Sequence, residues 1–258
     1  MRILGFDTAT RATAVAVWDA ADRAFQAIEA RDDPGGGGRP NHTTRLMALI
    51  VEVLERSDTT WAGLDRIAVG VGPGTFTGLR IGIATARALG RARGIPVVGV
   101  STLRSLALGA RGIASGDPRV RATAGRPSPP PFDAQLAVLD ARRGEVFAAC
   151  WRAGEPAIAP AELLLAPRAL SPDTLARLAP ELGRSVLAVG EGAVEFRQIL
   201  ERSGTWIPED ESGLHRVTAI NHCRLAGGMP AAGDPDEVRP EYLRLPDAEI
   251  SLRDARKP

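Results

Sequence analysis

A glycine-rich loop that joins an apolar stretch to a helical one constrains the fold of this chain more than any other feature. The apolar run Arg66–Val71 predicts a buried β-strand, and the residues from Thr77 to Arg93 have the composition and spacing of a helix. Between them lies Gly72-Pro-Gly-Thr-Phe-Thr-Gly78. A buried strand that turns directly into a helix is the repeating unit of α/β proteins, so this junction predicts that class.

The loop itself has two chemical interpretations. Free backbone N–H groups at a helix N-terminus attract phosphate. The loop is not a Walker A motif, however, because Leu79 and Arg80 stand where that motif has Lys and Ser or Thr. The alternative is a tight strand-to-helix turn capped by a threonine, and the glycine spacing alone favours it. The candidate phosphate contacts are Gly72, Gly74 and Thr75.

Two helices have faces that predict contact with another subunit. In the helix after the loop, a small residue recurs every fourth position, which lets a second helix come closer than the usual 8–10 Å or so. Residues His42 to Ser57 form an amphipathic pattern of about four turns. We predict that both helices enter an inter-subunit bundle, with internal packing against a sheet as the alternative. The predicted interface residues are Leu46, Leu49, Ile50, Val53, Leu54, Gly78, Leu79, Gly82, Ile83, Ala86 and Gly90.

The two halves of the chain repeat one order of elements. Arg2–Asp7 and Gln135–Asp140 both have the pattern of a strand that ends in Asp and continues through a turn into a second strand. Later in each half, an apolar strand leads through glycines into a helix, at Gly72 and again at Gly190 and Gly192. Two matched units in the same order favour an internal duplication, although Asp in turns and Gly after strands are common.

Two segments have the composition of insertions. Residues 32–40 include four consecutive glycines, and residues 109–131 are rich in Gly, Ala, Ser, Arg and Pro. We therefore predict an N-terminal subdomain at 1–101 and a C-terminal subdomain at 102–258, with a mobile insertion at 109–131. The final helix and tail are predicted to pack back on the first subdomain.

The charged and metal-binding residue types exclude several classes of function. Lys and Arg number 32 against 31 Asp and Glu, so the chain lacks the overall basicity of a nucleic-acid binder. Its three histidines and its two cysteines, Cys150 and Cys223, have neither metal-ligand nor disulfide spacing. No apolar run approaches the ~20 residues needed to span a membrane. We expect a cytoplasmic protein with no membrane association and no metal site.

Five segments of this chain resemble the bacterial TsaB (YeaZ) family. They span nearly the whole sequence, and the glycine-loop block is the most specific of them. The segments are Arg2–Thr10, Gly70–Ile83, Gly99–Leu103, Leu139–Phe147 and Glu241–Arg244. The resemblance implies an actin/hexokinase-like (ASKHA) α/β fold made of two related ribonuclease-H-like subdomains.

The resemblance also implies a function. Such proteins are required to put threonylcarbamoyl on the adenosine 3′ of the anticodon in tRNAs that read codons starting with A. Their catalytic paralogue, TsaD, has a metal-binding His-x-x-x-His, and in that register this chain has Thr102 and Leu106, which supply no imidazole. The resemblance thus implies a subunit with no catalytic residue that binds and activates TsaD. It further implies a homodimer when the chain is alone, and contact with the TsaE ATPase and with tRNA through the complex.

A kinase or ATPase is the first alternative. It would place a nucleotide and Mg²⁺ against Asp7, Thr8 and both glycine loops, as actin-like ATPases do. Ala9 and Thr10 stand where that phosphate loop normally has glycine, so we expect these loops to be vestigial. ATP or ADP with Mg²⁺ is then expected, if anywhere, at an interface shared with a partner.

Two further alternatives differ in class from the first. A direct tRNA-binding module would use the arginines of residues 111–126 as its electrostatic contact. A peptidase ranks last, because the sequence has neither a nucleophile motif nor metal-ligand spacing.

Overall fold

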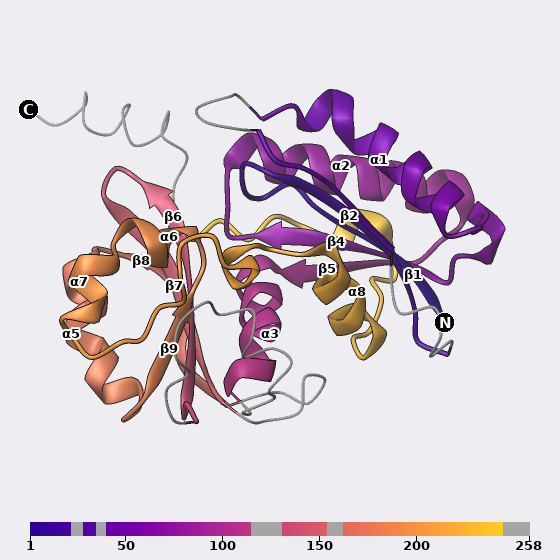
Figure 1. Ribbon diagram of the computed structural model, residues 1–258. Coiled ribbons are helices and arrows are strands. Elements are labelled where there is room, and N and C mark those ends of the chain that lie inside the picture. The colour runs from indigo at the N-terminus through magenta and orange to yellow at the C-terminus, as the bar shows by residue number, and fades with distance from the viewer. Residues whose placement is uncertain (22–27, 35–39, 115–130, 154–161, 245–258) are drawn as a thin grey trace, which may run out of the picture.

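The protein consists of two α/β subdomains, each built around one β-sheet (Figure 1). The computed structural model describes residues 1–21, 28–34, 40–114, 131–153 and 162–244. In the helices of these ranges, no segment is both long and apolar enough to cross a bilayer.

The first sheet has five strands in the order β3-β2-β1-β4-β5. β1 pairs in parallel with β4, and β4 with β5, whereas β2 runs antiparallel to both β1 and β3. The predicted strand before the glycine loop, β4, therefore lies next to the N-terminal strand. The strands are β1 (Arg2–Asp7), β2 (Thr13–Asp19), β3 (Ile28–Asp32), β4 (Arg66–Gly72) and β5 (Val97–Ser101).

Helices cover both faces of the first sheet. α1 (His42–Arg56) and α2 (Phe76–Arg93) lie on one face, and α8 (Ala219–Gly227) returns from the far end of the chain to the other (Figure 1). The strand alternation explains both layers, because Leu4 and Phe6 of β1 pack under α1 and α2 whereas Ile3 packs under α8. Each buried Leu, Ile or Val there stabilises the fold by roughly 1.5–3 kcal/mol.

The second sheet repeats the arrangement of the first. Its order, β8-β7-β6-β9, and its strand directions match those of β3-β2-β1-β4. The strands are β6 (Ala134–Arg142), β7 (Glu145–Arg152), β8 (Leu163–Leu170) and β9 (Val186–Val189). One face packs against α3 (Thr102–Ala114), and the other against α5 (Pro172–Leu182), α6 (Glu191–Glu195) and α7 (Arg197–Glu201).

The segment predicted as an insertion begins later than expected. Gly109–Ala114 is the last part of α3, and Ala110 is fully buried against the second sheet. The Gly- and Ala-rich composition concealed these residues, which continue the buried face of Leu103 and Leu106 at helical spacing. The rest of this segment up to residue 130, and residues 35–39 of the other predicted insertion, lie outside the described residues.

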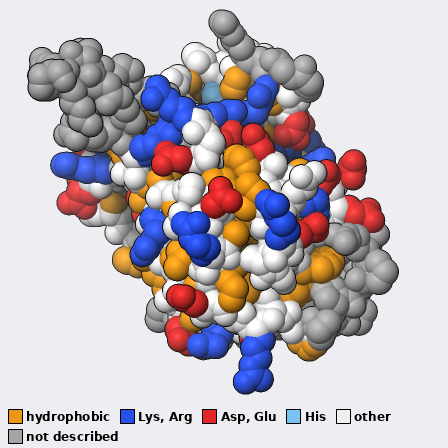
Figure 2. Space-filling model, turned by 90° about the vertical axis from the view of Figure 1, so that its left-hand side faces the viewer, with side chains coloured by type: hydrophobic (Ala, Val, Ile, Leu, Met, Phe, Trp, Pro, Cys, Tyr) orange, Lys and Arg blue, Asp and Glu red, His pale blue; other side chains and the backbone are white. Residues whose placement is uncertain are grey.

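The outer end of the second subdomain, where α5 and α7 lie, has a mixed surface. Figure 2 shows arginines at the top, across the middle and at the bottom of this face, with acidic and hydrophobic side chains interspersed among them. Such an alternation of sign does not form the continuous basic stripe that marks an electrostatic footprint for nucleic acid.

Candidate functional site

The eleven predicted interface residues lie inside this chain. Those of α1 and α2 that carry a side chain are at most 7% exposed, and the three glycines are also buried. Seven of the eleven belong to the core cluster between the two helices and the first sheet. A partner therefore cannot contact these side chains while the fold is intact, and docking on α1 and α2 has to use the opposite faces of the helices.

The small residues of α2 allow the helix to approach its own chain. A Cβ atom at Gly78 would lie 1.9 Å from the carbonyl oxygen of Thr8, and one at Gly82 would lie 2.5 Å from the Thr8 hydroxyl. A Cβ at Gly90 would lie 2.6 Å from Val97 of β5. The stripe thus does permit a close approach, as its spacing predicts, but the element that it approaches belongs to the same subdomain.

The outward residues of α1 and α2 form a different set. Met47 and Val51, one turn apart on α1, are 43% and 46% exposed. On α2, Ala84 and Ala88 are exposed. We call these four residues the outer face. Hydrophobic periodicity did not mark them, because it identifies the apolar stripe that a helix buries, and Met47 and Val51 lie off that stripe.

The two predicted phosphate loops of the first subdomain pack against each other. The Thr8 hydroxyl donates a hydrogen bond to the Gly78 carbonyl oxygen at 2.7 Å. The backbone N–H of Thr75 donates one to the Ala9 carbonyl oxygen, also at 2.7 Å. A Cβ at Gly74 would lie 2.4 Å from the Ala9 carbonyl oxygen. The fold thus packs the Thr8–Ala9 turn directly against the Gly74–Gly78 part of the loop, so the two candidate phosphate loops satisfy each other's backbone groups.

The candidate phosphate-binding glycines Gly190 and Gly192 lie in the other subdomain, just after β9 and beside β6. Gly190 has a φ of 114°, and a Cβ there would lie 2.1 Å from the carbonyl oxygen of Val138. Its N–H donates to Nδ1 of His215 at 3.1 Å, and Nε2 of this ring lies 3.3 Å from the Pro208 carbonyl oxygen. Burial lowers the pKa of His215. A neutral ring protonated at Nε2 satisfies both contacts, so this loop too is held from within.

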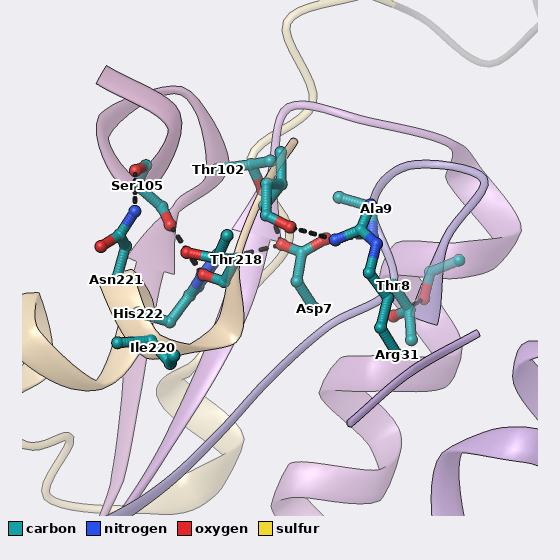
Figure 3. Close-up of polar contacts among 12 residues, drawn as sticks. Asp7, Thr8, Ala9, Arg31, Thr102, Ser105, Thr218, Ile220, Asn221 and His222 are labelled. Carbon is teal, nitrogen blue, oxygen red and sulfur yellow. Dashed lines mark hydrogen bonds and ion pairs between the residues drawn. The ribbon is translucent and has the colours of Figure 1, made fainter. Parts of the chain in front are cut away.

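Asp7, at the end of β1, is the centre of a buried polar network (Figure 3). Its carboxylate accepts hydrogen bonds from the Ala9 N–H at 2.8 Å and the Thr102 hydroxyl at 3.1 Å. Nε2 of His222 lies 3.0 Å from the same carboxylate, although its N–H is not aligned as a hydrogen bond. Burial acts to raise the pKa of Asp7, but His222 and the hydrogen bonds outweigh it and hold the pKa below its usual value.

The network continues through His222 to two helices. Nδ1 of His222 lies 2.9 Å from the Ser105 hydroxyl and 3.0 Å from the Thr218 carbonyl oxygen. The Asn221 amide donates to the Ser105 carbonyl oxygen at 3.2 Å. Ser105 belongs to α3, which packs on the second sheet, and His222 to α8, which packs on the first. The polar network thus connects the cores of both subdomains.

The contacts Asp7–His222–Ser105 resemble the acid–base–nucleophile order of a catalytic triad. A substrate cannot reach these three side chains, however. Their exposed fractions are 1%, 0% and 0%. A nucleophilic serine needs a reacting carbonyl within about 3 Å, and nothing from solvent reaches this one. The space is tight as well, since a Cβ at Gly70 would lie 1.9 Å from the Asp7 carboxylate. The arrangement is that of a structural network.

A nucleotide-bound Mg²⁺ does not fit at Asp7. Mg²⁺ keeps several water ligands when one or two carboxylates bind it, and the Asp7 carboxylate is instead surrounded by protein donors. Elsewhere in the described ranges, no three His, Cys, Asp or Glu side chains gather as metal ligands.

The last described residues tie the two subdomains together. The N–H of Glu241 donates to the Val71 carbonyl oxygen at 2.7 Å, just before the glycine loop. Tyr242 stacks on Phe76 of α2, with 5.3 Å between ring centroids. Arg244 then pairs with Glu145 of the second sheet at 3.1 Å. The Glu241–Arg244 segment of the family resemblance therefore bridges α2 and β7.

Paired subdomains with matching sheets define the class of this protein as actin/hexokinase-like (ASKHA), as predicted. A solved structure of YeaZ from Pseudomonas aeruginosa supports this fold, with a TM-score of 0.68 at 22% identity over 94% of this chain and 99% of that one. At the level of sequence, the chain is 32% identical to the tRNA threonylcarbamoyladenosine biosynthesis protein TsaB of Escherichia coli K12, over 95% of both chains. The protein belongs to the TsaB family, which confirms the predicted resemblance.

Two further matches agree with this assignment. The TsaB protein of Bacillus subtilis 168 is 28% identical over 85% of this chain and 86% of its own length. Residues 36–155 match a family model described as TsaD, tRNA N6-adenosine threonylcarbamoyltransferase. The segment matched by this transferase model contains Thr102 and Leu106, the positions at which the family resemblance places the histidine pair of TsaD.

Proposed function

We propose that this chain is a non-catalytic subunit required for threonylcarbamoylation of the adenosine 3′ of the anticodon in tRNAs that read codons starting with A. The observation that carries the proposal is the structural role of Thr102 in the core of a TsaB-family fold. This residue stands in the register of a metal-binding histidine and is fully buried, with its hydroxyl donating to Asp7. Leu106, in the register of the second histidine, is also fully buried. Both positions stabilise the core of this chain.

The chain acts, in this proposal, by binding TsaD and stabilising its active state. The outer face supplies the docking surface, because it presents Met47 and Val51 to solvent on the helix pair. A homodimer uses the same face when TsaD is missing. TsaE and tRNA are reached through the complex, and a nucleotide with Mg²⁺ is expected only where two subunits share a pocket.

The two enzymatic alternatives are weaker than this proposal. An autonomous kinase needs Asp7 open to a metal-bound nucleotide, whereas internal donors surround its carboxylate. A serine peptidase needs an accessible hydroxyl, and Ser105 has no exposed surface. The arginine segment of the tRNA-module alternative lies mostly outside the described residues.

Placing aspartate at Met47 and Val51 is expected to weaken TsaD binding at least tenfold, about 1.4 kcal/mol or more, because a docked surface would then bury two unpaired charges. Both side chains are largely exposed, so the fold should persist. Isothermal titration calorimetry with purified TsaD measures the effect.

The matched control is Leu163→Asp, which adds a charge at an equally exposed hydrophobic residue, 47% exposed, on β8 of the other subdomain. It should bind TsaD like the wild type. Equal affinity of wild type, control and outer-face variant would remove the docking surface from the proposal.

A further inference from the structure

A cavity of about 330 Å³ lies between the two subdomains, and no residue of the outer face lines it. The first subdomain contributes Thr10, Arg31 and Asp33 to its walls. The second subdomain and the segment that leaves it contribute Glu191, His215 and Arg216. Its volume is at the small end of the roughly 300–1,000 Å³ that ligand pockets occupy, so a small molecule fits it best.

Several polar groups of this cavity are already satisfied. Arg31 donates to the Asp33 carboxylate at 2.7 and 2.8 Å and to the Val217 carbonyl oxygen at 2.6 Å. His215 uses both ring nitrogens on Gly190 and Pro208. These groups shape the walls and have little capacity left for a ligand.

Two groups of opposite charge in this cavity make no side-chain hydrogen bond or ion pair with any described residue. They are the carboxylate of Glu191 and the guanidinium of Arg216. Arg216 is exposed, whereas Glu191, the first residue of α6, is half-buried. Burial, and then the neighbouring Asp140 carboxylate, raise the pKa of Glu191, and the charges of Arg142 and Arg11 only partly offset them. An ammonium group placed beside Glu191 would relieve this unfavourable environment.

We propose that this cavity binds a small zwitterion of the α-amino-acid class, with the ligand ammonium on Glu191 and the ligand carboxylate on Arg216. Guanidinium is well suited to a carboxylate, which it can bind through two parallel hydrogen bonds. A polyphosphate fits poorly, because its charge would meet the carboxylates of Glu191, Asp33 and Asp210 in the same cavity. The proposal rests on this cavity alone and does not depend on TsaD.

The test uses the full chain without partners. The common L-α-amino acids are screened by saturation-transfer NMR, and the strongest binder is titrated by calorimetry beside its carboxamide and its N-acetyl derivative. Each derivative removes one of the two charges, and each is expected to bind at least tenfold more weakly. Failure of every amino acid to bind, or equal binding of the derivatives, would overturn the proposal.

Variants assign the binding to this cavity. Glu191→Gln and Arg216→Gln should each weaken the strongest binder at least tenfold. Matched controls are Glu181→Gln, an exposed glutamate on α5, and Arg202→Gln, an exposed arginine, both outside the cavity, and both should bind like the wild type. Wild-type affinity of the two cavity variants would place any binding elsewhere and refute the assignment.

Discussion

Gly82→Arg is expected to destabilise the fold itself, and not merely to release a partner. A Cβ at this position would already lie 2.5 Å from the Thr8 hydroxyl and 3.6 Å from Val69. A longer, charged side chain has to displace α2 from the first sheet and enters the core without a partner. We expect a loss of at least about 3 kcal/mol of unfolding free energy, which lowers the midpoint of thermal unfolding by about 6 °C or more.

The matched variant is Ala84→Arg, two residues further along α2 on the outer face. Ala84 is exposed, so this substitution should leave the melting temperature within about a degree or two of the wild type, as surface changes usually do. Thermal unfolding followed by circular dichroism separates the two cases. A folded Gly82→Arg protein with an unchanged midpoint would contradict the assignment of the small-residue stripe to the core.

His222→Ala is expected to destabilise the protein by about 1–3 kcal/mol or more, the usual cost of leaving a buried polar group without a partner. The substitution removes the imidazole nitrogen that lies 3.0 Å from the Asp7 carboxylate, in a site that is 1% exposed. It also removes a side chain that contacts Ser105 of α3. Urea unfolding monitored by tryptophan fluorescence measures the loss.

A second substitution distinguishes the effect of the Asp7 charge from simple loss of packing. Asp7→Asn in the His222→Ala background removes the stranded charge, so it should recover part of the lost stability. In the wild type, the lowered pKa of Asp7 contributes stability above the unfolded pKa near 3.8, and this contribution is lost as the pH falls through the folded value. The advantage of the wild type over Asp7→Asn should therefore shrink only below about pH 4. An advantage that is constant down to pH 2 would show that the carboxylate charge has no role.

The sequence predicted the helices and strands of this fold well, but it did not predict what each of them packs against. The apolar run at Arg66–Val71 and the glycine loop correspond to β4 and the turn into α2. The amphipathic helix from His42 is α1. Periodicity identifies which stripe of a helix is apolar, but it does not say whether that stripe meets a sheet or another subunit. For that reason the sequence pattern of α1 and α2 predicts a docking surface where the fold has part of its core.

Sequence patterns also fail to predict the polar network around Asp7, because its members lie far apart in the chain. The sequence indicates Asp7 as a candidate site residue because it ends the first strand. The other members of its polar network, Thr102, Ser105 and His222, come from helices far along the chain. No local pattern marks His222, which occupies a buried position of an ordinary helical repeat. Only the return of α8 to the first sheet brings it to Asp7, and this tertiary contact is invisible in the spacing of residues.

The most direct test of the central claim is reconstitution of tRNA threonylcarbamoylation from purified components, with and without this chain. The proposal predicts modified adenosine only when TsaD and this chain are both present, and full activity when Thr102 is replaced by serine, which keeps the hydroxyl that donates to Asp7. Modification by TsaD and the remaining components at the same rate without this chain, or by this chain in the absence of TsaD, would contradict it.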